Sequence, residues 1–268
     1  MKRFLLGLLF FSFASLSAGA SNFDSGIYAV ARDLRFAEDD EHCDGVPVDR
    51  AFQPVKWGDT LVCFDYEEVR RDGLHFPDVI ALHTKSSFGP SAKVHYFSGV
   101  ANSGTIQDVF LLSIAPAAED RLFVIYRDPN PNRWFSALYQ VAVFQLNGEG
   151  LSRDEGLSEF FGMGGDFSHD GLAYVFPYRS RKEIESSVNS ALFRLATSSG
   201  EVIGTVQDKT YLYEKIPSAD WNSITSSYLI KGDKVSVIDA LAGWCNVTYS
   251  AGARPVKAWV KCESMIIN

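Results

Sequence analysis

The residues that could carry chemistry are few, and their spacing matches no common catalytic motif. Ser168, His169 and Asp170 are the residue types of a hydrolytic triad, but three consecutive residues cannot form a hydrogen-bonded relay, and no G-x-S-x-G sequence is present. The five histidines show neither H-x-H nor H-E-x-x-H spacing, which disfavours a zinc hydrolase. We therefore expect a non-enzymatic protein that needs no cofactor or metal.

Two segments resemble ligand-binding loops only in part. Residues 128–132 begin like a calcium loop, but Arg133 stands where a glycine should turn and Tyr139 where a glutamate should close the ligand shell. The run Gly164-Gly165-Asp166 is glycine-rich but lacks the lysine of a phosphate-binding loop. We interpret this run either as a tight turn or as a loop that binds a partner.

The charge of the chain restricts its partners. The sequence holds 33 acidic and 25 basic residues, a formal net charge of −8, so it lacks the excess of lysine and arginine that binding to nucleic acid or anionic lipid requires. A basic protein or a neutral ligand fits better. The densest acidic run is Glu38, Asp39, Asp40 and Glu41, which would steer a basic partner if it is more than a solvated loop.

The four cysteines, Cys43, Cys63, Cys245 and Cys262, predict disulfides rather than a thiol nucleophile. Sequence alone does not choose among the three possible connectivities. Locality favours two short loops, which join Cys43 to Cys63 and Cys245 to Cys262. We expect no metal site at these cysteines, because no C-x-x-C is present.

The first 20 residues have the form of a cleaved signal peptide. Lys2 and Arg3 precede an apolar run, and Ala18-Gly19-Ala20 supplies small residues for cleavage before Ser21. The apolar run is shorter than the roughly 20 residues that a membrane-spanning helix needs. We therefore expect a periplasmic protein with no stable membrane anchor. Loss of the two basic residues would change the formal charge from −8 to −10.

The elements that must position any site are mostly strands. From residue 21 to about 200 we expect one antiparallel β domain, a sandwich or a meander, with one short helix that follows the capping box at Ser180 and Glu183. The polar stretch 197–200 predicts a linker before a second domain at 201–268. The predicted strands of the first domain are 26–33, 60–67, 78–84, 92–97, 108–114, 121–126, 137–146 and 172–176.

The last part of the chain predicts five short strands of a small barrel. These strands are 210–214, 227–230, 234–239, 244–249 and 256–261. The segment 229–237, with the turn Lys231-Gly232-Asp233, followed by Gly243-Trp244 and by a second tryptophan, Trp259, resembles a bacterial SH3 (SH3b) domain. The resemblance implies an SH3-like barrel that binds cell-wall peptides or other proteins. A hairpin turning near Gly252 would place Cys245 opposite Val260, close to Cys262.

Aromatic residues are dense in this C-terminal part. They either line a groove for a peptide or fill the core of the barrel. The candidates for the groove are Tyr211, Tyr213, Trp221, Tyr228 and Trp244.

These observations favour a binding protein over an enzyme. The leading hypothesis is an exported inhibitor that captures another protein, of the kind that gives immunity to a secreted lipase or a cell-wall-degrading toxin. The alternative is a cell-envelope module whose barrel binds peptidoglycan peptides. An unrecognised hydrolase in the first domain is the third possibility.

Overall fold

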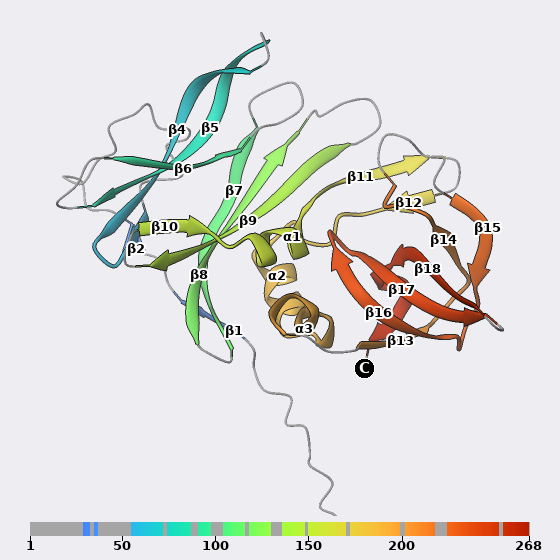
Figure 1. Ribbon diagram of the computed structural model, residues 1–268. Coiled ribbons are helices and arrows are strands. Elements are labelled where there is room, and N and C mark those ends of the chain that lie inside the picture. Colours follow the sequence, from blue (N-terminus) through green and yellow to red (C-terminus); the bar gives the residue numbers. More distant parts are fainter. Residues whose placement is uncertain are drawn as a thin grey trace, which may run out of the picture.

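The computed structural model confirms a mainly β protein (Figure 1). It describes residues 29–32, 35–36, 55–71, 74–86, 91–97, 104–115, 118–129, 136–147, 150–169, 172–198, 202–217, 224–251 and 254–267. Within these ranges the strands form three antiparallel sheets, with a few short helices between them. No helix of the described part is long and apolar enough to cross a membrane. The predicted signal peptide lies outside the described residues.

The first sheet has the order β2-β3-β4-β5-β6. Its members are β2 (Arg35–Phe36), β3 (Val55–Trp57), β4 (Thr60–Arg71), β5 (Leu74–Ser86) and β6 (Ala92–Phe97). The hairpin of β4 and β5 dominates it and extends beyond the predicted strands at 60–67 and 78–84, because pairing continues to Arg71 and Leu74 after a bulge.

The second sheet forms the central layer, with the order β1-β7-β8-β9-β11-β12 and with β10 paired to β9. Its members are β1 (Ala29–Arg32), β7 (Thr105–Ile114), β8 (Glu119–Asp128), β9 (Ala137–Asn147), β10 (Gly150–Arg153), β11 (Met163–His169) and β12 (Leu172–Tyr174).

Both faces of the central sheet are buried. In β8, Val124 faces a core shared with the first sheet, whereas Phe123 and Ile125 face a second core on the opposite side. Side chains of successive strand residues point to opposite faces, so a strand buried on both sides reads as a continuous apolar run. This is why β7 to β9 have little polar alternation. Of the two predicted arrangements, the first two sheets pack as a sandwich.

Helices cover the other face of the central sheet. They are α1 (Glu155–Phe161), α2 (Arg181–Val188), η1 (Ala191–Phe193) and α3 (Arg194–Thr197). The predicted capping box is present at the start of α2, where Ser180 Oγ accepts from the backbone N–H of Glu183. The Glu183 carboxylate in turn accepts from the backbone N–H of Arg179, 2.8 Å away. Helix α1 was not predicted.

The third sheet holds the C-terminal strands in the order β15-β14-β18-β17-β16-β13-β19. These are β13 (Val202–Val206), β14 (Thr210–Tyr213), β15 (Ile224–Leu229), β16 (Lys234–Leu241), β17 (Trp244–Ala251), β18 (Arg254–Lys261) and β19 (Met265–Ile267), with the short helix η2 (Cys262–Ser264) before β19. The five predicted strands are all present, and β13 and β19 add to them.

The predicted disulfide between Cys245 and Cys262 is confirmed. In the β17–β18 hairpin Cys245 pairs with Val260, as the expected turn requires. Cys63 is also disulfide-bonded. Its predicted partner, Cys43, lies outside the described residues.

One apolar core joins the central sheet, the helices and the third sheet. Phe110 of β7, Phe160 of α1, and Val237 and Val260 of the third sheet belong to the same buried cluster. The third sheet is therefore packed on the rest of the protein through buried side chains. Helix α3 ends at Thr197, so the first residue of the predicted linker 197–200 is helical, and strand β13 begins at Val202.

Candidate functional site

The run Gly164-Gly165-Asp166 is neither a turn nor a loop, because it forms part of strand β11 and pairs with Tyr139, Leu138 and Ala137 of β9. A side chain at Gly164 would collide with the ring of Phe176, whose nearest atom lies 2.6 Å from the position of a Cβ. The glycine thus allows a close approach, not a turn.

Asp166 orders the segment that follows β12. Its Oδ1 accepts from the backbone N–H of Phe176 at 2.7 Å, and its Oδ2 lies 3.1 Å from Arg179 Nη1. Both oxygens are occupied inside the molecule. Asp166 therefore has an internal role, and its predicted contact with a partner stays a prediction.

Two of the predicted aromatic contacts belong to the core. Trp244 and Tyr213 are each 2% exposed. The Trp244 ring stacks on Tyr174 at a centroid distance of 5.2 Å and meets Tyr213 edge-on at 5.1 Å. Burial raises the pKa of the Tyr213 hydroxyl above its ordinary value. These side chains offer no surface to a partner, and they connect the third sheet to β12.

The other two described candidates are exposed. Tyr211 of β14 and Tyr228 of β15 are 46% and 50% exposed and face each other across the strand pair, with ring centroids 6.4 Å apart. Lys209 Nζ lies 5.1 Å from the Tyr211 centroid and 4.2 Å from that of Tyr228. Ile224, the first residue of β15, and Ile230, the residue directly after its end, are also exposed. We call these four apolar residues the β15 patch.

The remaining predicted contacts are Trp221 and the acidic run Glu38, Asp39, Asp40 and Glu41. They lie outside the described residues.

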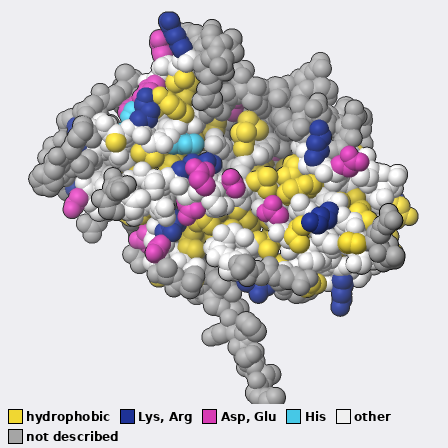
Figure 2. All heavy atoms as spheres, in the orientation of Figure 1, with side chains coloured by type: hydrophobic (Ala, Val, Ile, Leu, Met, Phe, Trp, Pro, Cys, Tyr) yellow, Lys and Arg dark blue, Asp and Glu magenta, His cyan; other side chains and the backbone are white. Residues whose placement is uncertain are grey.

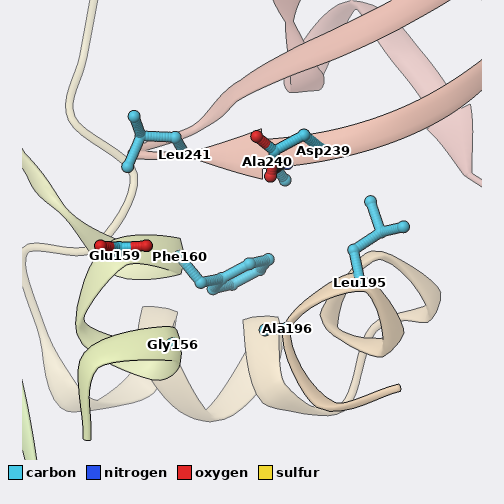
Figure 3. A pocket seen from close by; sticks show the side chains of 8 residues that line it. All are labelled: Gly156, Glu159, Phe160, Leu195, Ala196, Asp239, Ala240 and Leu241. Carbon is cyan, nitrogen blue, oxygen red and sulfur yellow. Dashed lines mark hydrogen bonds between the residues drawn. The ribbon is translucent and has the colours of Figure 1, made fainter. Parts of the chain in front are cut away.

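A pocket that the sequence did not predict opens between α1, α3 and β16 (Figure 3). Its volume is about 410 Å³. Phe160, Leu195 and Leu241 supply apolar walls, and Glu159 and Asp239 supply carboxylates. The signal for α1 was present in the sequence: Asp154 can cap a helix, and Leu157, Phe160 and Phe161 follow at helical spacing.

A polar network ties strands β4, β5 and β6 together on the outer face of the first sheet. Glu67 Oε1 lies 2.8 Å from His83 Nε2, and Glu67 Oε2 accepts from Lys93 Nζ at 2.6 Å and from the Tyr96 hydroxyl at 3.0 Å. Burial alone would raise the pKa of Glu67, but the hydrogen bonds from Lys93 and Tyr96 outweigh it and hold the pKa below its ordinary value. An ionised glutamate with both oxygens engaged suits a cross-strand tie better than a proton acceptor.

Metal chemistry has no evident site in the described ranges, where no three or more His, Cys, Asp or Glu side chains are grouped to hold an ion. Comparisons of the chain with protein-family models, with curated proteins and with solved structures find no match. The candidates for function are thus the β15 patch and the pocket beside α1.

Proposed function

We propose that this chain is an exported, non-enzymatic binding protein that captures another protein, as an inhibitor of a secreted lipase or a cell-wall-degrading toxin would. The observation that carries the proposal is the β15 patch, a set of exposed large side chains on and beside the edge strand of a sheet. Its four members are large exposed side chains, of which Tyr211 and Tyr228 face each other across β14 and β15. Patches of this kind mark sites of protein interaction.

The edge of the sheet supports this reading. Strand β15 is six residues long, pairs only with β14 among the described strands, and holds no charged residue. Edge strands in soluble proteins are usually short or protected by charges, because an open edge can pair with another chain. The opposite edge follows this rule, since β19 has only three residues. An extended segment of a partner would add to β15 through backbone hydrogen bonds and pack on Tyr228.

The other parts of the proposal rest on the sequence. The signal-peptide pattern supports export to the periplasm, and the acidic balance favours a basic partner whose association weakens with salt. The segment from Leu229 to Trp259 supports an SH3b-like barrel, a module that serves protein binding as well as wall binding.

Photo-crosslinking at Tyr228 tests the proposal. The full chain carrying benzoylphenylalanine at position 228 is illuminated in a bacterial envelope extract that contains intact sacculi, and Lys182, exposed on α2, serves as the control position. We expect one protein to crosslink at 228 and none at 182. Adding Tyr211→Ala should weaken the crosslink, whereas Ile266→Ala should not, because Ile266 is 53% exposed on the opposite edge strand.

The envelope-module alternative predicts a different result. If the chain is retained on purified sacculi and crosslinks only to peptidoglycan peptides, the inhibitor proposal is wrong. If the Tyr211→Ala and Tyr228→Ala variants are still retained on sacculi, the β15 patch is not the site that binds peptidoglycan.

A further inference from the structure

The pocket beside α1 combines an apolar wall with unpaired negative charge. Its two charged members are Glu159 of α1 and Asp239 of β16, and both side chains are exposed. Figure 3 shows the Phe160 ring reaching into the space between α1 and α3, beneath the strand that carries Asp239. Figure 2 shows several acidic side chains near the middle of the molecule, with basic side chains beside some of them.

Neither carboxylate has a cation as a partner within the described residues. Asp239 Oδ1 accepts from the backbone N–H of Ala240 at 2.8 Å, and no basic residue lines the pocket. Two carboxylates at the rim of one pocket leave a local negative charge that no basic residue of the lining offsets. A bound cation would offset it.

The walls of the pocket are held in place before any ligand arrives. At the end of α1 the carbonyl of Phe160 accepts from the backbone N–H of Ala242 at 2.9 Å, which joins the helix to the third sheet. On its other side α1 is fixed to β9, because Ser158 Oγ accepts from Val143 N at 2.9 Å and donates to Val143 O at 3.2 Å. A preformed site spends little binding free energy on ordering itself.

We infer that this pocket receives a lysine or arginine side chain of the captured protein. Such a side chain has an apolar stem, which would pack on Phe160 and Leu241, and a cationic head, which would lie near Glu159 and Asp239. A second copy of this chain is a poor occupant because each copy carries a net charge of −8. The inference rests on the proposed function only for the source of the side chain.

Methyl NMR of the full chain tests the pocket without the partner. The probes are acetyl-Gly-Lys-Gly-amide, its arginine analogue and the norleucine analogue, which keeps the apolar stem but lacks the charge. The reporters are the methyl groups of Leu195 and Leu241. We expect the two cationic peptides to shift these resonances at concentrations at which the norleucine peptide does not, and we expect added salt to weaken the effect.

Matched variants separate this site from general charge. Glu159→Gln and Asp239→Asn should each weaken the cationic peptides by roughly two- to fivefold, the range for an exposed ion pair, whereas Asp208→Asn, with the same change in charge on an exposed residue outside the pocket, should not. Equal binding of the norleucine peptide, or equal loss with Asp208→Asn, would overturn the inference. Tighter binding of spermidine than of either peptide would assign the pocket to a free polyamine instead.

The two proposals can fail separately. If no protein crosslinks at Tyr228 but the cationic peptides still bind, the proposed function is wrong and the pocket still binds cations. A crosslink that persists with no response at Leu195 and Leu241 would reject the pocket alone.

Discussion

His95 of β6 is buried in a way that makes protonation of its side chain unfavourable in the folded protein. Its side chain lies between the first sheet and β9, where its ring meets the rings of Phe97 and Phe144 edge-on at 4.7 and 5.6 Å. Its Nε2 is buried and has no hydrogen-bond partner among the described residues. Burial, with a smaller contribution from the charge of Arg153, lowers the pKa of His95 from 6.5 to about 4.

This shift predicts a loss of stability in mild acid. Because the folded-state pKa lies below the unfolded value, the unfolded chain takes up a proton first, and stability falls as the pH drops from about 6.5 towards 4. The loss should reach about 2 to 3 kcal/mol at the lower end, since one pKa unit corresponds to about 1.4 kcal/mol. Urea unfolding from pH 7.5 to 4 measures it, with His95→Gln as the variant that cannot ionise. The two pH profiles should diverge below pH 6.5, and parallel profiles would reject this origin.

Gly164 occupies a position in β11 where the packing leaves no room for a side chain. A Cβ there would lie 2.6 Å from the Phe176 ring, which is itself buried in the core, so Gly164→Ala forces the ring or the strand to move. Overpacking of this kind costs about 1 to 3 kcal/mol. Gly156→Ala is the matched control, because its Cβ would have 3.9 Å of clearance within α1 and should stabilise the helix slightly. If the urea midpoints of the two variants shift equally, a side chain at Gly164 does not destabilise the protein through its contact with Phe176.

At the scale of elements, α2 gives the clearest test of a signal read from sequence. Ser180 caps the helix, and its hydroxyl also contacts the Glu183 carboxylate at 2.9 Å. Ser180→Ala should lower the free energy of unfolding by about 1 kcal/mol, the usual value of an N-cap. Ser186→Ala, an exposed position inside the helix, should be neutral or slightly stabilising. If Ser186→Ala destabilises as much as Ser180→Ala, the cap is not what stabilises α2.

The elements differ in how far sequence could predict them. The β17–β18 hairpin and the capping box of α2 were predictable because their signals are local: turn residues, alternation, and a serine three residues before a glutamate. Strand β11 was not, since Gly164 and Gly165 resemble turn residues, and only the fold shows that Phe176, 12 positions after Gly164, fills the space beside that glycine. The sequence contains the Asp154 cap of α1, but the glycines on both sides of this segment favour turns, so the helix was not predicted.

The candidate sites show the same division between local and distant causes. Sequence identified Tyr211 and Tyr228, which lie on adjacent strands of one hairpin-like pair. It could not separate them from Tyr213 and Trp244, because Trp244 packs on Tyr174, which lies far away along the chain, and Tyr213 packs on Trp244. The pocket could not be predicted from the sequence for the same reason, since Glu159 and Asp239 line one pocket only when α1 packs against β16.

The whole molecule is built around one core that crosses from the central sheet to the third sheet. The Tyr174 hydroxyl donates to the carbonyl of Ala242, and Tyr174 stacks on Trp244. When either sheet unfolds, the packing contacts between these buried aromatic side chains are lost for both sheets. We therefore expect the sheets to unfold in a single cooperative transition. This expectation distinguishes the molecule from two domains joined by a flexible linker, which would unfold independently.

The Cys245–Cys262 disulfide makes this cooperativity measurable. Removing a bridge that closes a loop of 17 residues should cost about 3 kcal/mol by releasing the unfolded chain. In a Cys245→Ala, Cys262→Ala variant, amide exchange should then accelerate in β8 of the central sheet as well as in β17, because the shared core transmits the loss. Tyr174→Phe provides a control in which the bridge remains but the bond to Ala242 is lost. Acceleration confined to the third sheet would show that it unfolds alone and that the common core does not couple the layers.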